Sequence, residues 1–362
     1  MNRIHSPLGY PGLLNSSNVQ ERWETRKREM GRSTVECRIP VIQNIVDSRS
    51  REIWEKYFEL LFFYFRLQNR FEKYAGELKS GATSFYDYMF CDGNLNETKL
   101  LDLLMEDPRR NADLVTSPSN SEKQLITKVF NYEYLSSKYH TEFDELVQML
   151  GVDVCPYCGR AFTTTVRLGH DGFIRTNQVD HYFPKSQKPW LALSIWNLVP
   201  VCGSCNHRKK DNDGCVLYPY VEDAGDVYRF RTQPCDGLGY LVGARDSEEE
   251  FRVVLERLYE TSSGDSHIER AEREVEMLGI EELYASHNSY VSGIFRQRYV
   301  FGTPYIDDLV NTFPRLFRNR DDVLAMLSLR RLEDENLGSA PLDRLTRDIH
   351  QEIDQLTGEE SA

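Results

Sequence analysis

The alternation of apolar and polar positions predicts a helical region in the first part of the chain. From about residue 41 the spacing becomes helical, and residues 53–71 are apolar around most of a helix, with Glu59 and Arg66 as interruptions. A helix with so wide an apolar surface needs neighbours on several sides, so we predict the centre of a helical domain, with a partner-binding surface as the alternative. Residues 1–35 are rich in Ser, Asn, Gly and charge, lack a sustained apolar period and are expected to be poorly ordered.

The pattern changes in the middle of the chain. Residues 161–168 and 173–181 are rich in β-forming side chains, and the glycine-bounded segment 169–172 between them predicts a hairpin turn. Residues 189–196 are expected to form a loop with one helical turn, and residues 205–211 a short helix. The expected order of elements is therefore strand, strand, helix.

The last third of the chain returns mostly to helical spacing. Short strands are expected at 228–231 and 238–242, and helices at 248–259, 267–278, 281–299, 306–317, 321–332 and 341–356. The predicted fold class is α+β. It comprises a helical N-terminal domain at 36–150, a central module at 151–215 and a mostly helical C-terminal region with a few short strands at 216–362.

Two pairs of closely spaced cysteines enclose the central module. Each pair spans one tight turn, so its two sulfurs can converge on one ion, and two pairs supply the four thiolates of a closed tetrahedral zinc site. The expected zinc ligands are Cys155, Cys158, Cys202 and Cys205. The remaining cysteines are scattered singly at positions 37, 91, 215 and 235, which is typical of a reducing cytosol and not of a disulfide framework, so we expect a cytoplasmic protein.

Polar residues inside this cysteine frame carry a family resemblance. Asp180-His181 and Asn197 lie between the two pairs, and Asn206 directly follows the last cysteine. This order resembles the HNH endonuclease family, whose ββα-metal fold is often clamped by four cysteines, over roughly residues 151–215. The resemblance implies that Asp180 and Asn206 bind a divalent cation and that His181 activates water. It also implies that Asn197 braces the loop carrying the histidine, and it leaves open whether Asn206 or the adjacent His207 completes the metal shell.

Phosphodiester hydrolysis calls for such groups on chemical grounds. An imidazole with an ordinary pKa near ~6.5 can accept the proton of the attacking water at neutral pH. A hard cation neutralises charge on the phosphate and on the leaving oxygen, and carboxylate and amide ligands favour magnesium or manganese over zinc. Asp180 and His181 are adjacent, so on an extended strand they point to opposite faces, and serving one phosphate requires the strand to bend there.

The distribution of charge sets the central module apart from the rest. The net charge of the chain is −13, yet residues 151–215 contain eight Lys and Arg against five Asp and Glu. Lys185, Arg208 and Lys209 flank the Asp-His and Cys-Asn elements and are candidate phosphate contacts, with a solvated surface as the alternative for each. The acidic remainder predicts weak unguided binding to DNA and a partner that delivers the substrate.

We therefore predict a metal-dependent HNH endonuclease that cleaves DNA, with RNA as the other candidate substrate, a structural zinc ion and a catalytic magnesium or manganese ion. The resemblance also suggests a nuclease of a bacterial anti-phage or restriction system that works with an ATPase or sensor subunit. One alternative is a catalytically silent, zinc-stapled module that binds nucleic acid or a partner. Another is a structural or regulatory protein in which the helical flanks do the work. The sequence lacks an apolar stretch of 18 residues, so a membrane span is not expected.

Overall fold

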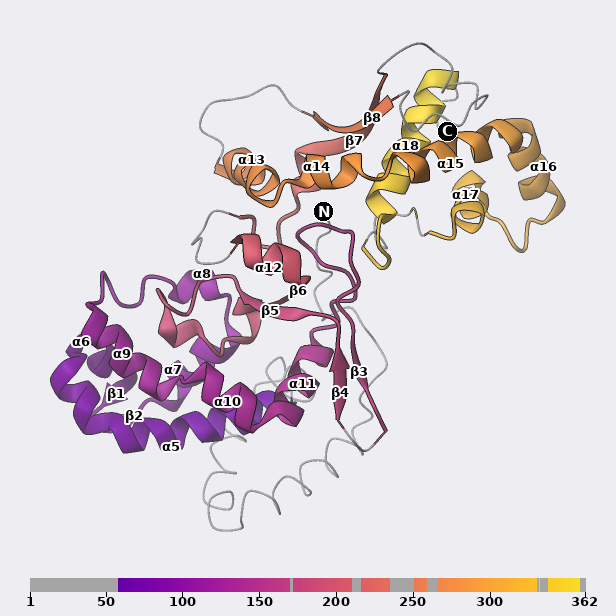
Figure 1. The fold of residues 1–362 in the computed structure, drawn as a ribbon. Coiled ribbons are helices and arrows are strands. Elements are labelled where there is room, and N and C mark those ends of the chain that lie inside the picture. The colour runs from indigo at the N-terminus through magenta and orange to yellow at the C-terminus, as the bar shows by residue number, and fades with distance from the viewer. Residues whose placement is uncertain are drawn as a thin grey trace.

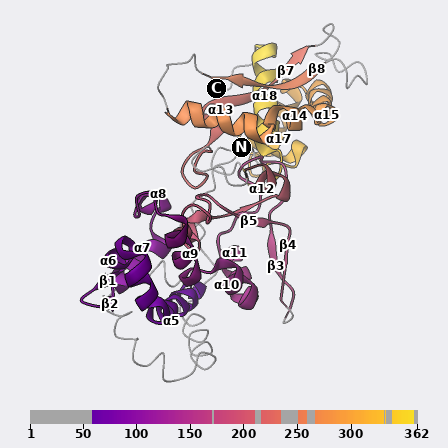
Figure 2. The ribbon, with the colours of Figure 1, turned by 60° about the vertical axis from the view of Figure 1, so that its left-hand side comes forward.

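The computed structural model describes residues 58–169, 172–209, 216–234, 251–258, 266–330, 332 and 338–358. Three regions follow one another along the chain, and the middle region lies between the other two in both views (Figure 1, Figure 2). The expectations for residues 1–35 and for a strand at 238–242 lie outside the described residues, as do the cysteines at 37, 215 and 235.

The N-terminal region is a group of helices built around the apolar helix expected from the sequence. Helix α5 (Phe58–Gly81) buries Phe63, Leu67 and Phe71 completely, and the ring of Phe71 meets that of Phe130 edge-on at a centroid distance of 5.6 Å. Residues 53–57 of the predicted helix lie outside the description. The other elements of this region are α6 (Thr83–Met89), β1 (Phe90–Cys91), β2 (Asn94–Leu95), α7 (Glu97–Met105), α8 (Pro108–Asn111), α9 (Asn120–Val129), α10 (Tyr132–Lys138) and α11 (His140–Met149).

The middle region contains a hairpin and a separate ββα unit. Strand β3 (Thr165–Arg167) pairs with β4 (Phe173–Arg175), and the glycines at 169 and 172 have φ of 45° and 119°, in the region that favours glycine. The ββα unit consists of β5 (Gln178–His181), antiparallel to β6 (Leu198–Val201), followed by α12 (Gly203–Lys209). The short 3-10 turns η2 (Pro189–Leu191) and η3 (Ile195–Asn197) connect its strands.

The expected order strand, strand, helix is present, but the second strand of the unit is not among the predicted runs. All four residues of β6 are buried, so this strand shows no alternation of apolar and polar positions. The second half of the run at 173–181 is β5, and its first half belongs to the hairpin.

The C-terminal region contains a strand where the sequence predicts a helix. The helix expected at 248–259 is wrong, because β8 (Phe251–Arg257) is a strand that pairs antiparallel with β7 (Tyr228–Pro234). Phe251 and Val253 are buried while Arg252 between them is exposed, which is the period of a strand with one face on the core. The remaining elements are η4 (Ala224–Asp226), α13 (Ser266–Leu278), α14 (Ile280–Ala285), α15 (Asn288–Val300), α16 (Thr303–Thr312), α17 (Arg320–Ser328) and α18 (Asp343–Thr357).

A continuous hydrophobic core extends through all three regions. Phe71 of α5, Leu198 of β6, Phe230 of β7 and Ile349 of α18 belong to the same cluster of buried side chains. A second, smaller cluster joins α16 and α17. The flanking regions therefore pack against the ββα unit and hold it on two sides. Each described helix is too short or too polar to cross a membrane.

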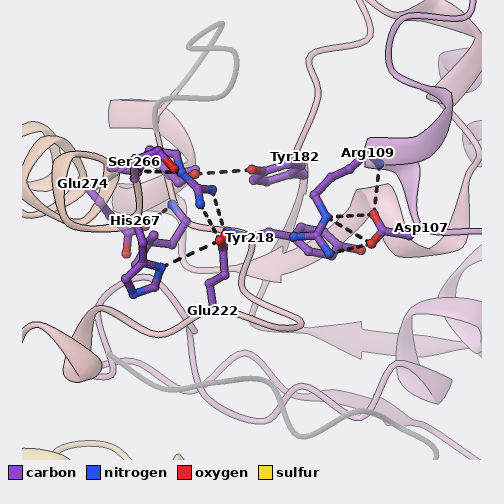
Figure 3. Close-up of polar contacts among 11 residues, drawn as sticks. Asp107, Arg109, Tyr182, Tyr218, Glu222, Ser266, His267 and Glu274 are labelled. Atoms are coloured by element: carbon purple, nitrogen blue, oxygen red, sulfur yellow. Dashed lines mark hydrogen bonds and ion pairs between the residues drawn. The ribbon is translucent and has the colours of Figure 1, made fainter. Parts of the chain in front are cut away.

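A polar network lies where the three regions meet (Figure 3). Arg270 of α13 donates to the Oε2 atom of Glu222 at 2.7 Å, and Arg109 of α8 lies over the ring of Tyr218 at 4.6 Å. Glu274 of α13 is buried, and its Oε2 atom accepts a hydrogen bond from the backbone N–H of Leu217 at 2.8 Å. Burial raises the pKa of Glu274 to about 8.

This buried carboxyl predicts a pH dependence of stability. The folded pKa of Glu274 lies above its ordinary value of 4.5, so the folded protein binds more protons than the unfolded chain between these values. The free energy of unfolding should therefore fall by up to a few kcal/mol as the pH rises from about 4.5 to about 8. Glu274→Gln should flatten this slope in chemical denaturation, whereas Glu276→Gln at an exposed position of the same helix should not. Equal slopes in both variants would contradict the assignment.

Candidate metal centre and active site

The four cysteines of the two pairs meet in one place. Their sulfur atoms all lie within 4.8 Å of one another, and the Sγ atoms of Cys158 and Cys202 are 3.9 Å apart. A tetrahedral zinc ion with Zn–S bonds of about 2.3 Å places its sulfur ligands about 3.8 Å apart. Burial raises the pKa of the Cys155 thiol, so a thiolate there requires a cation beside it. The cluster fits a closed structural zinc site.

The zinc-binding turn is also the point where the C-terminal region docks. The Tyr284 hydroxyl of α14 donates to the carbonyl oxygen of Cys158 at 2.7 Å, and the N–H of Leu342 donates to that of Gly159 at 2.8 Å. Arg160 Nε donates to His287 Nε2 at 2.9 Å. The first Cys-x-x-Cys turn is therefore hydrogen-bonded to α14 and to Leu342, the residue before α18.

Asp180 and His181 occupy the end of β5 and face different neighbours. The pairing with β6 continues through Asp180↔Val199 and His181↔Leu198, so the bend expected between the two residues is not seen. The Asp180 side chain contacts the first Cys-x-x-Cys turn and α12, whereas the His181 ring contacts α10 and the residue that follows η2. Regular antiparallel pairing imposes this separation, because successive side chains leave a strand on opposite faces.

The His181 ring is fixed in one tautomer. Its Nε2 atom lies 3.0 Å from the carbonyl oxygen of Ala192, and its ring meets that of Tyr132 edge-on at a centroid distance of 4.5 Å. Because a carbonyl oxygen only accepts, Nε2 carries the proton and Nδ1 keeps its lone pair. Burial, with the charges of Lys185 and Lys209, lowers the pKa of His181 to about 3, so the ring is neutral at neutral pH.

Asn197 ties together the segments that surround this histidine. Its Oδ1 atom accepts from the N–H of Phe183 at 2.8 Å, and its Nδ2 atom donates to the carbonyl oxygens of Phe183 at 3.1 Å and Leu191 at 3.0 Å. Leu191 precedes Ala192, whose carbonyl oxygen holds the His181 ring. The completely buried amide thus connects the loop after His181 to the turn that orients it.

Asn197→Asp tests this arrangement because it preserves shape and removes two donors. A carboxylate at this position faces two carbonyl oxygens that it cannot bond, which should lower the free energy of unfolding by at least about 2 kcal/mol. Calorimetry or chemical denaturation measures this loss, with the exposed Asn94→Asp as a control that should change little. Equal stability of the two variants would show that the amide donors at 197 do not matter.

Asp180 belongs to a buried ion pair. Its Oδ2 atom accepts from the Tyr157 hydroxyl at 2.7 Å and lies 2.9 Å from the Lys209 ammonium. The Lys209 and Asp180 side chains are 1% and 8% exposed. Burial raises the pKa of Asp180 above its ordinary value, while Lys209 and Tyr157 act in the opposite direction. Sequence reasoning missed both partners, because a tyrosine inside a zinc-binding turn and a lysine in a basic run look like packing and surface residues.

Asn206 and His207 do not converge on Asp180 in the described arrangement. The Nδ2 atom of Asn206 donates to Oε1 of Gln178 at 2.7 Å, and His207 is exposed. Among the described residues, three or more Cys, His, Asp or Glu side chains lie close enough together to hold a metal at one place, which is the four-cysteine cluster. With an ammonium already on Asp180 and the Asn206 amide bonded elsewhere, this donor set does not fit a divalent cation between the two residues.

Residues 155–212 match the family model described as HNH endonuclease. The chain contains an HNH domain. The match begins at the first zinc ligand and spans β5, β6 and α12. No curated protein and no solved structure matches the chain. Because HNH nucleases act on nucleic acid, the domain suggests a nuclease-type function.

The three basic residues expected to contact phosphate all have partners within the protein. Lys185 forms an ion pair with Glu133 at 2.6 Å, and Arg208 Nη1 donates to the carbonyl oxygen of Leu278 at 2.9 Å. Lys209 is buried, so the described conformation does not offer it to DNA. Lys185 lies beside the aromatic ring that packs on the histidine, since its ammonium is 4.6 Å from the ring of Tyr132.

Proposed function

We propose that the HNH domain hydrolyses phosphodiester bonds in DNA, with His181 as the general base. The observation that carries the proposal is the hydrogen bond between His181 Nε2 and the Ala192 carbonyl oxygen. It leaves the Nδ1 lone pair to accept a proton from water. Asn197 acts as a positioning residue for the turn that carries this carbonyl.

The family resemblance adds a magnesium or manganese ion held by Asp180 and by Asn206 or His207. Such an ion would neutralise negative charge on the phosphate when bound. Lys209 already occupies this carboxylate, so the role proposed for His181 rests on its own hydrogen bond and not on the ion.

A nuclease assay tests the proposal. Purified protein should nick or linearise plasmid DNA in the presence of Mg²⁺ or Mn²⁺, and His181 variants should not. Single-stranded DNA and RNA serve as parallel substrates, because the described residues around His181 do not indicate a preference for deoxyribose or ribose. Equal inertness of the wild type and the variants on all substrates, with each metal, would overturn the enzymatic proposal.

The buried Asp180–Lys209 pair favours a second candidate function, a silent zinc-stapled module that binds nucleic acid or a protein. In that case Asp180, His181 and Asn206 would stabilise the fold and take no part in catalysis. DNA binding without cleavage, unaffected by His181 replacement, would favour this candidate.

The role in a bacterial defence system and the ATPase or sensor partner also remain proposals. The defence role rests on the family resemblance. The need for a partner is supported by the acidic remainder of the chain and by the internal pairing of Lys185, both of which predict weak DNA binding without help. Full nuclease activity of the isolated protein at physiological salt would contradict the need for a partner.

A further inference from the structure

Lys209 is held in the manner of a bound cation. Lysine is almost never fully buried unless it is paired, and this side chain is 1% exposed. Its Nζ atom lies 2.9 Å from Asp180 Oδ2 and donates to the carbonyl oxygens of His181 at 2.9 Å and Tyr182 at 3.1 Å. An ammonium has three N–H groups, so these three oxygens use all of its donors.

The oxygens around Lys209 are of the kind that hard divalent cations prefer. One carboxylate and two backbone carbonyls converge on the ammonium, and the same carboxylate oxygen also accepts from Tyr157. Mg²⁺ binds oxygen ligands at 2.0–2.1 Å, whereas an ammonium nitrogen lies about 2.9 Å from the oxygen that accepts its hydrogen bond. A divalent ion on this carboxylate oxygen would lie against the ammonium, and two cations so close in a buried setting repel each other strongly.

The position of Lys209 in the helix makes this contact specific to the ββα unit. Asn206 and Lys209 lie one turn apart on the same side of α12, and both face β5, where they contact Gln178 and Asp180. The length of α12 and its packing on β5 therefore bring the ammonium to the strand end. The neighbouring Arg208 points instead to α13.

We propose that Lys209 is the built-in cation of this site, and that it excludes a divalent metal from Asp180 while it keeps its three contacts. The proposal rests on the proposed function only in assigning Asp180 to the cleavage site. It has a functional consequence. An HNH domain in this conformation is closed to metal at Asp180, and metal loading there requires the Lys209 ammonium to leave the carboxylate.

Mn²⁺ binding tests the proposal without any measurement of cleavage. The full chain with its zinc site filled is titrated with Mn²⁺ alone, and the signal of free Mn²⁺ is followed by electron paramagnetic resonance. The wild type and Asp180→Asn should bind Mn²⁺ equally, because the wild type should have no Mn²⁺ site at Asp180. Lys209→Met keeps the aliphatic stem and removes the charge, so it should gain one Mn²⁺ site at least tenfold tighter than any in the wild type. The double variant Lys209→Met with Asp180→Asn should lose that site again.

Two results would overturn the proposal. One is an Asp180-dependent Mn²⁺ site in the wild type, and the other is a folded Lys209→Met protein without a new site. Zinc content and near-ultraviolet circular dichroism establish whether Lys209→Met is folded. If Lys209→Met is not folded, the comparison of Mn²⁺ binding by the wild type and by Asp180→Asn tests the proposal by itself. A nuclease assay that fails would leave these binding results standing, so the two proposals can fail separately.

Discussion

Replacing His181 with alanine or glutamine is expected to lower the rate of DNA cleavage by about 10²- to 10⁴-fold, the usual contribution of a general base. Neither side chain has a basic lone pair. Glutamine can still donate to the Ala192 carbonyl oxygen, so His181→Gln should retain the packing that alanine loses. The rate of plasmid nicking under single-turnover conditions measures the effect, and zinc content should stay at the wild-type level in both variants.

His140→Ala is the matched control for this prediction. His140 is exposed at the start of α11 and lies outside the HNH domain, so its loss should change cleavage little. Equal losses of activity in His140→Ala and His181→Gln would show that the effect is not specific to His181. Loss of zinc together with activity in His181→Gln would show that the histidine supports the fold and not the chemistry.

Replacing Cys158 with serine is expected to release the structural zinc ion and unfold the HNH domain. Apparent zinc-binding energies of about 10–16 kcal/mol are coupled to folding, and they match or exceed the total stability of a typical protein. The effect should spread beyond the domain, because the carbonyl oxygen of Cys158 accepts from Tyr284 and the core is continuous across the three regions. Zinc analysis and limited proteolysis, with cleavage sites identified by mass spectrometry, measure both consequences.

Cys91→Ser provides the control for the zinc prediction. Cys91 is exposed and lies outside the four-sulfur cluster, so its replacement should change the free energy of unfolding by less than about 0.5 kcal/mol. A Cys158→Ser protein that keeps one zinc ion per chain and the proteolytic pattern of the wild type would contradict the structural role of the metal.

These two predictions differ in how far the sequence supports them. The zinc cluster follows from spacing alone, because a Cys-x-x-Cys turn brings its own two sulfurs together and requires only that the two turns meet. The surroundings of His181 do not follow from spacing. The Ala192 carbonyl reaches it from the end of η2 and the Tyr132 ring from α10, and Tyr132 is separated from it by 49 positions in the sequence.

The secondary structure shows the same division. The apolar helix α5 was predictable because burial on most sides leaves a dense apolar period. The pattern of strand β8 predicts a helix instead, because a short apolar run suits either element until a pairing partner is known, and that partner is β7. Strand β6 is buried on both faces and therefore shows no alternation to detect.

The sequence by itself indicated the four-cysteine cluster that fits zinc, the order of the Asp-His, Asn and Cys-Asn elements, and the presence of an HNH domain, because these depend on local spacing. The tertiary structure alone decided what each polar side chain contacts. It placed Lys209 on Asp180 and Asn206 on Gln178, and it turned His181 toward Ala192. The physical reason is that a buried charge or amide takes whichever partner the packing of distant elements brings within bonding distance, and that packing is set by the shared core.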